Sequence, residues 1–166
     1  MRKLPLVPIP VLLTLLAGAC QQPASPRTAE RVAADMDALR TQWQELANAD
    51  DFAGVANLYT EDAVFVAPDG SVHDGRAAIT AYFEKSFPQS TGFTAQTVGT
   101  VVSGDMAAAY GTWSDTETLP AGDQVVGGMW QTVGVYQADG LKIRLHLAMI
   151  PAVAPDAATP AAAPAK

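Results

Sequence analysis

The first half of the chain carries hydrophobic residues at helical spacing. Val32, Met36, Leu39, Trp43 and Leu46 follow one another at intervals of four, three, four and three residues. This spacing places all five side chains on one stripe of a helix and leaves polar residues on the other faces. We therefore predict a helix that ends near residue 48 and packs this stripe against the rest of the protein.

A short helix, a strand and a second helix are predicted between residues 50 and 87. Asp50 and Asp51 can cap the first of these helices, because a short carboxylate accepts hydrogen bonds from free backbone N–H groups. The run at residues 63–66 is β-branched and aromatic, which is typical of a strand, and turn residues follow it. The second helix presents hydrophobic residues on its inner face: Ile79, Tyr82, Phe83 and Phe87.

Alternation of hydrophobic and polar residues dominates from residue 93 onward and predicts four strands, over residues 93–103, 106–116, 125–137 and 141–150. Tight hairpin turns are expected at 103–105 and 138–140, and a looser connection at 119–123. Such short connections favour an antiparallel meander. Three glycines in the third strand indicate a bulge or a strong bend: Gly127, Gly128 and Gly134.

Three segments carry a family resemblance: LYTEDAVF at residues 58–65, GRAAI at 75–79 with Tyr82 and Phe83 behind it, and DGLKI at 139–143 followed by His146. They resemble the NTF2-like superfamily of SnoaL-like, DUF4440-type domains over residues 29–151. The resemblance implies an α+β fold for a domain at 28–151. In this NTF2-like cone, three N-terminal helices pack on a strongly bent antiparallel β-sheet around a cone-shaped pocket. One fold hosts many unrelated sites, so the resemblance is weak for function.

The first 19 residues have the features of an export signal. Arg2 and Lys3 form a basic start, residues 11–17 form a short hydrophobic core, and small residues precede Cys20. The hydrophobic stretch is too short to span a membrane. The run LAGAC at residues 16–20 resembles a bacterial lipobox, which implies a lipid on Cys20 and a polar tether over residues 20–27.

Cys20 is the only cysteine, so an internal disulfide is excluded. The alternative to lipidation is a fortuitous cysteine at the end of an ordinary signal peptide. Gln21 and Gln22 follow Cys20 instead of Asp, which, by resemblance to Gram-negative lipoproteins, implies the outer membrane. The protein is thus expected to be exported and held in the cell envelope, facing the periplasm, by the lipid on Cys20.

Charge and composition narrow the possible partners. Without residues 1–19 the chain keeps eight basic and 17 acidic side chains, which leaves a net charge of −9. An acidic domain without clustered Lys and Arg is not expected to bind nucleic acid. The tail at residues 152–166 is rich in Ala and Pro and is expected to be disordered, because it has almost no large hydrophobic side chains to bury.

Sequence motifs give little chemistry. The sequence contains no nucleotide-binding glycine loop, CxxC pair, HExxH helix or nucleophile elbow. His73 and His146 are the only histidines, and a zinc site needs three or four protein ligands, so neither a metal nor a cofactor is expected. His73 lies in the run SVHDG and is expected to be a solvated loop residue.

Tyr59, Asp62 and His146 are the candidate catalytic residues. A buried carboxylate with a raised pKa could move a proton beside a bound carbonyl, as the Asp base of ketosteroid isomerase does next to a Tyr-containing oxyanion hole. The alternative for Asp62 is a hydrogen bond to the backbone where helix passes into strand. Asp115 and Glu117 lie near an expected loop and are expected to be solvated.

The sequence allows two orientations of His146 on the last strand. Strict alternation directs Ile143, Leu145, Leu147 and Met149 towards the helices. His146 would then lie on the outer face as a structural or interface residue. A bulge in the strand would reverse this orientation and direct His146 into the pocket.

Aromatic residues on converging elements are the most consistent sign of a pocket: Trp43, Tyr59, Phe65, Tyr82, Trp113, Trp130 and Tyr136. Such residues suit a small apolar or aromatic molecule, with their polar tips fixing its orientation. The alternative is that the rings close the core and leave no cavity. Trp43 in particular lies on the helical stripe, where a Trp is commonly a core residue.

Three functions are compatible with these features. The first is a lipid-anchored protein that binds a small, mainly apolar molecule in a cone-shaped pocket. The second is an isomerase, cyclase or dehydratase of the SnoaL or ketosteroid-isomerase type that uses Asp62, Tyr59 or His146. The third is a non-catalytic structural module that forms a homodimer through the outer face of the sheet.

Overall fold

The computed structural model describes residues 27–87, 90, 92–104 and 106–151. This part of the chain forms α1 (Ala29–Asn48), α2 (Phe52–Asn57) and α3 (Arg76–Ser86), with six strands, β1 (Tyr59–Val66), β2 (Val72–Asp74), β3 (Thr94–Ser103), β4 (Met106–Leu119), β5 (Gly122–Gln137) and β6 (Gly140–Met149). The predicted signal segment, its Cys20 and the tail at 152–166 lie outside the described residues. None of the described helices is long and hydrophobic enough to span a membrane.

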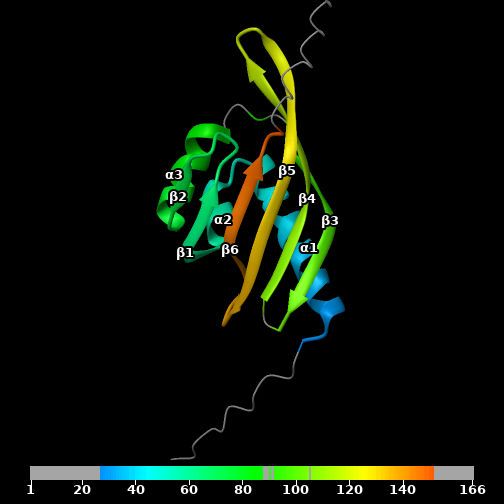
Figure 1. The fold of residues 1–166 in the computed structure, drawn as a ribbon. Helices are drawn as coiled ribbons and strands as arrows, with labels where there is room; N and C mark the ends of the chain where they lie inside the picture. Colours follow the sequence, from blue (N-terminus) through cyan, green and yellow to red (C-terminus); the bar gives the residue numbers. More distant parts are fainter. Residues whose placement is uncertain (1–26, 88–89, 91, 105, 152–166) are drawn as a thin grey trace, which may run out of the picture.

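The strands form one sheet in the order β2-β1-β6-β5-β4-β3. α1 crosses one face of this sheet, whereas α2 and α3 lie beside β1 and β2 (Figure 1). The predicted α+β architecture is therefore confirmed. The expected antiparallel sheet is corrected to a mixed one, because β6 returns from the meander of β3–β6 to pair in parallel with β1.

The periodic stripe of the first helix faces the core. Thr28 caps α1 by accepting a hydrogen bond from the N–H of Arg31 at 3.2 Å. Buried α1 residues include the first four of the predicted stripe, Val32, Met36, Leu39 and Trp43, and then Ala47 in place of Leu46. Because the helix has 3.6 residues per turn, the position that faces the core shifts along the stripe, and in the last turn it falls on Ala47.

Local polar contacts set the boundaries of α2 and α3. The carboxylate of Asp51 caps α2, as predicted, by accepting a hydrogen bond from the N–H of Gly54 at 2.8 Å. Asp50 instead adopts a φ of 55° in the turn between α1 and α2. At the start of α3, Arg76 donates from Nη2 to the carbonyl oxygen of Tyr59 at 2.7 Å, which attaches this helix to β1.

β4 and β5 are longer than predicted and extend beyond the other strands as a hairpin (Figure 1). Their pairing runs from Met106↔Val135 to Leu119↔Gly122, so the loose connection expected at 119–123 is a tight turn. Gly128 stands where β5 meets β6 closely, since a Cβ there would lie 1.8 Å from the carbonyl oxygen of Met149. A side chain at this position would therefore force the two strands apart.

The two faces of the sheet differ in their surroundings. The inner face and the helices bury large side chains, including Tyr59, Ile79 and Phe83. The opposite face exposes hydrophobic side chains: Val101, Met106, Tyr110, Met129 and Met149. The homodimer contact expected on this outer face stays a prediction.

Candidate functional site

A pocket of about 130 Å³ lies between the helices and the inner face of the sheet. Residues of α1, α3, β1 and β3–β6 contribute to its wall, which is mainly aromatic and aliphatic. Buried side chains such as Leu39, Ile143 and His146 form its floor, and the more exposed Pro68, Tyr82 and Ser86 form its mouth. The cavity is thus a small apolar space with a few polar groups at defined positions, the usual composition of a ligand site.

Five of the seven aromatic residues predicted for the pocket line it: Trp43, Phe65, Tyr82, Trp113 and Trp130. Tyr59 is completely buried and lies outside the wall, behind His146. Tyr136 is also outside the wall, because it packs beside Val32 and Met36 in a second core cluster and donates to the Asp35 carboxylate at 2.6 Å. Phe83, Phe87 and Phe93 add three rings that the sequence did not single out for the pocket.

Three buried side chains form a hydrogen-bonded chain behind the pocket. Trp43 donates from Nε1 to the hydroxyl oxygen of Tyr59 at 3.0 Å. The oxygen of Tyr59 lies 2.6 Å from Nδ1 of His146. The buried Tyr59 hydroxyl proton needs an acceptor, and Nδ1 is the acceptor that the described residues place within reach, so we assign Nδ1 as the acceptor and the imidazole proton to Nε2.

His146 therefore presents an N–H group to the pocket. Nδ1 is engaged with Tyr59 behind the wall and His146 lines the pocket, so Nε2, which no described residue bonds, lies on the cavity side of the ring. Burial lowers the pKa of His146 to about 3. Burial also raises the pKa of Tyr59 well above its ordinary value. The hydrogen-bonded side chains of Trp43, Tyr59 and His146 are consequently neutral at physiological pH, and the Nε2–H of His146 is a fixed hydrogen-bond donor.

A bulge in β6 explains the orientation of His146. Gly134 pairs with Ile143 and Val133 pairs with Leu145, so Arg144 is an extra residue in the register. Ile143 and His146 are therefore both buried on the inner face. The strict alternation that placed Leu145, Leu147 and Met149 inward is wrong, because the bulge reverses the side-chain parity after Ile143.

Asp62 lies outside the pocket, on an exposed part of β1. Its carboxylate forms an ion pair with Arg144 at 3.2 Å and accepts a hydrogen bond from the Thr60 hydroxyl at 2.9 Å. The carbonyl oxygen of Asp62 also accepts a hydrogen bond from Arg144. The structure thus brings two of the three candidate catalytic residues, Tyr59 and His146, together and separates them from Asp62.

Asp115 is one of two carboxylates, with Glu117, that line the pocket among the described residues and were expected to be solvated. It is 6% exposed and lines the pocket, where its Oδ1 accepts a hydrogen bond from the Ser90 hydroxyl at 2.6 Å. The expectation that Asp115 is solvated is wrong because β4 continues to Leu119. Extending the alternation of the buried Ala107 and Ala109 along β4 would have placed Asp115 on the inner face.

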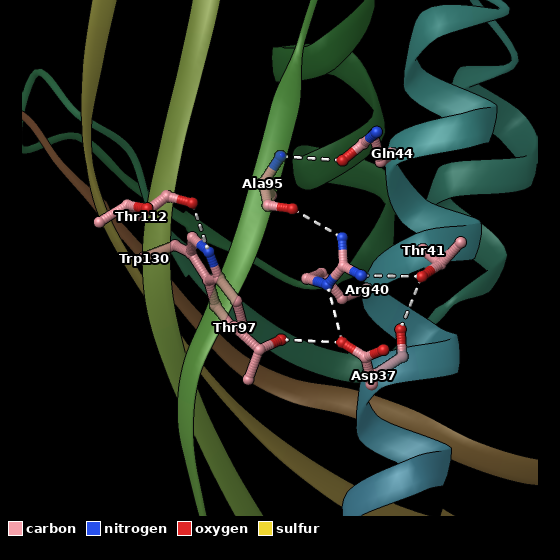
Figure 2. Close-up of polar contacts among 8 residues, drawn as sticks. All are labelled: Asp37, Arg40, Thr41, Gln44, Ala95, Thr97, Thr112 and Trp130. Carbon is pink, nitrogen blue, oxygen red and sulfur yellow. Dashed lines mark hydrogen bonds and ion pairs between the residues drawn. The ribbon is translucent and has the colours of Figure 1, made fainter.

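Arg40 lines the pocket with its hydrogen-bonding groups already engaged. Nε contacts the Asp37 carboxylate at 3.1 Å, Nη1 donates to the carbonyl oxygen of Ala95 at 2.7 Å, and Nη2 donates to the Thr41 hydroxyl at 2.9 Å (Figure 2). Asp37 also accepts from the Thr97 hydroxyl at 3.0 Å. These contacts attach α1 to β3 and match the charge of Arg40 within the protein.

His73 lies in the short strand β2 rather than in a solvated loop as expected. Its ring centroid lies 4.4 Å from that of Tyr82, and its Nε2 is 2.8 Å from the Ser71 hydroxyl. His73 therefore packs against a residue at the mouth of the pocket. In the described ranges, no three or more His, Cys, Asp or Glu side chains are grouped so that they could hold a metal ion.

The helices, the curved sheet and the enclosed pocket define a protein of the NTF2-like class. A ketosteroid isomerase-like protein from Erwinia carotovora atroseptica is similar over 74% of this chain and 96% of its own, with a TM-score of 0.64 and 19% identity. An NTF2-like protein with a cystatin-like fold from Novosphingobium aromaticivorans is similar over 75% and 87%, with a TM-score of 0.62 and 16% identity. At these identities the likeness shows the fold.

The SnoaL-like domain family matches residues 40–146, and the chain belongs to this family. A further similar structure is that of a single-residue variant of Rv3472, a protein of unknown function from Mycobacterium tuberculosis. The two chains are 24% identical, with a TM-score of 0.62 and coverage of 72% of this chain and 71% of the other. No sequence among curated proteins matches this chain.

Proposed function

We propose that this protein binds a small, mainly apolar or aromatic molecule in the pocket. The observation that carries this proposal is the fixed Nε2–H of His146 at the floor of an otherwise aromatic cavity. A donor that faces an otherwise apolar cavity favours a ligand that brings an acceptor atom to it. The hydrogen bonds from Trp43 through Tyr59 hold the ring ready for such a ligand, so little ordering remains to be done on binding.

The size of the cavity limits the ligand. A volume of about 130 Å³ is close to that of an engineered protein cavity of about 150 Å³ that binds benzene. A single ring with a short substituent fits these dimensions, and a longer molecule would extend through the mouth. The rings of Trp43, Phe65 and Trp130 supply the flat contact surface that an aromatic ligand prefers.

Ligand binding can be followed directly, because all three tryptophans line the pocket. We expect 2-phenylethanol, a neutral single-ring probe, to change the tryptophan fluorescence in a saturable way. Ala148→Phe should abolish this response by filling the cavity. Leu147→Phe, the adjacent change on the outer face, should leave it intact. Equal titrations for both variants would contradict the proposed pocket.

A second candidate function is proton transfer beside a carbonyl, favoured by Asp115 in the same pocket as His146. The Asp115 carboxylate would take a proton from the carbon next to the carbonyl, the C–H electron pair would form the C=C bond of an enolate, and the carbonyl π pair would move onto the oxygen. His146 Nε2–H would stabilise that oxyanion, and the proton would then return to carbon. This chemistry would relate the chain to its ketosteroid isomerase-like neighbour.

Deuterium exchange tests the second candidate without knowledge of the substrate. In heavy water, the protein should accelerate exchange of the protons beside the carbonyl of α-tetralone. Asp115→Asn should remove this acceleration by removing the base, and Asp62→Asn should preserve it. The measurement is the rate of deuterium incorporation by mass spectrometry. An unchanged rate in Asp115→Asn would eliminate this candidate.

We propose that the domain is exported and anchored to the outer membrane, facing the periplasm, through a lipid on Cys20. The supporting features are the basic start, the hydrophobic run and the LAGAC sequence. Cys20→Ser should move the protein from the membrane fraction to the unbound fraction and abolish labelling by a radioactive fatty acid. Ser25→Ala should change neither result. A fully membrane-bound, unlabelled Cys20→Ser protein would refute the anchor.

A further inference from the structure

The ionisable side chains that line the pocket are unequal in sign. Besides the tyrosine Tyr82, they are Arg40, Asp115, Glu117 and His146, of which His146 is neutral. The charge of Arg40 is matched by Asp37, as Figure 2 shows. Asp115 and Glu117 are left as the carboxylates of the wall, and the described lining residues place no further cation opposite them. The pocket therefore offers negative charge to whatever enters it.

Asp115 is placed to meet a ligand. Ser90 donates one hydrogen bond to Oδ1, and no described residue bonds Oδ2. Asp115 lines the pocket although only 6% of it is exposed, so its carboxylate borders the open space of the cavity. A carboxylate in such a wall has lost most of its water and gains from a cationic hydrogen-bond donor.

Glu117 extends the negative charge towards the mouth. It lies two residues beyond Asp115 on β4, where it forms an isolated bridge with Ser90, and it is less buried than Asp115. Burial raises the pKa of Tyr82 at the mouth, and the charges of Glu117 and Asp69 raise it further. The charge of Glu117 thus acts at the opening through which a ligand passes.

Aromatic rings lie beside these carboxylates. Trp113 precedes Asp115 by two residues on the same strand face and stacks with Phe93 at a centroid distance of 6.3 Å. The faces of Trp and Tyr attract cations, and more strongly where water is excluded. Carboxylates next to exposed ring faces are the combination that binds an ammonium group carrying an apolar body.

We propose that the ligand of this pocket is an organic cation: a small aromatic amine whose ammonium group pairs with Asp115 and Glu117 while its ring enters towards His146. This inference rests on the proposed ligand-binding function and adds the charge of the ligand. It also excludes organic anions of the same shape, because the two carboxylates repel them.

Three probes of nearly equal shape separate the contribution of charge: 2-phenylethylamine, 2-phenylethanol and phenylacetate. In tryptophan-fluorescence titrations at neutral pH, we expect the amine to bind about tenfold more tightly than the alcohol, because its contact with the carboxylates is charge-assisted. Phenylacetate should bind most weakly. Added salt should weaken binding of the amine and leave that of the alcohol nearly unchanged.

Matched variants test whether the carboxylates of Asp115 and Glu117 cause the preference for the amine. Glu117→Gln should reduce the preference for the amine, and Asp115→Asn with Glu117→Gln should bring its affinity down to that of the alcohol. Glu84→Gln, which removes an exposed carboxylate of α3 outside the pocket, should change nothing. Near-ultraviolet circular dichroism checks that each variant is folded, and Glu117→Gln alone tests the inference if the double variant is not.

The possible results separate the organic-cation inference from the ligand-binding function on which it rests. Equal affinities for amine and alcohol, or a preference that survives in Glu117→Gln and the double variant, would overturn the organic-cation inference and leave the proposed ligand-binding function standing. A failure of both amine and alcohol to bind would overturn the inference and the proposed function together.

Discussion

Lowering the pH below 6.5 is expected to destabilise the folded protein through His146. In the unfolded chain this histidine has its ordinary pKa of 6.5, whereas burial lowers the pKa to about 3 in the folded protein. Between these values the unfolded chain binds the additional proton, so the free energy of unfolding falls as the pH falls. The expected loss is about 1.4 kcal/mol for each pH unit below 6.5, and it is absent above that pH.

Denaturant unfolding between neutral pH and mildly acidic pH measures this loss. His146→Gln should show a much smaller dependence, because an amide does not titrate. His73→Gln, which changes the only other histidine, should leave the contribution of His146 in place. The carboxyl groups of Asp35 and Asp37, with pKa values lowered below 3.8, act at lower pH and are separated from this range.

A second observable covers the case in which His146→Gln does not fold. In nuclear magnetic resonance spectra of the wild-type protein, the ring protons of His146 should stay constant with pH until the protein unfolds. A His146 signal that titrates near pH 6.5 in the folded protein would contradict the buried neutral imidazole.

Phe83→Ala is expected to cause the largest loss of stability among single core truncations, about 3–5 kcal/mol. Phe83 is 1% exposed and contacts rings from three elements, with centroid distances of 5.6 Å to Trp43, 5.2 Å to Phe65 and 5.4 Å to Phe87. Removing its ring leaves a cavity that these neighbours cannot fill without losing their own contacts. Thermal or denaturant unfolding measures the loss.

Phe52→Ala is the matched control for this truncation. Phe52 is half-buried at the start of α2 and contacts Phe87 at the longer centroid distance of 6.2 Å. Its truncation should cost less than half as much as that of Phe83, because water can reach the vacated space. Similar losses in the two variants would show that the aromatic cluster is looser than the structure indicates.

Most of the fold could be predicted because the hydrophobic residues of a buried face recur at regular intervals in the sequence. Val32, Met36, Leu39 and Trp43 show the helical period and are all buried in α1. The hairpins after β3 and β5 use glycines with positive φ, Gly104 and Gly140, which the turn residues indicated. Both signals depend on neighbours in sequence, so they can be read without knowledge of the tertiary structure.

The site was harder to predict because it depends on contacts between distant segments. One extra residue, Arg144, decides whether His146 faces the pocket or the outer face, and no feature of the last strand marks the bulge. The inward position of Asp115 depends on how far β4 continues, which its pairing with β5 determines. Asp62 resembled a site residue by type, but its partner Arg144 is 82 residues away in the sequence.

The parallel pairing of β1 with β6 has a consequence for the order of assembly. Tyr59 at the start of β1 meets Ile143, a residue of the last strand. A growing polypeptide that has not reached residue 140 therefore contains every helix described here but neither the imidazole at the pocket floor nor the neighbour that β1 requires. Contacts this remote in sequence form late and slowly. Until then the nascent chain remains accessible to chaperones and proteases, and loss of its last strand would leave no functional fragment.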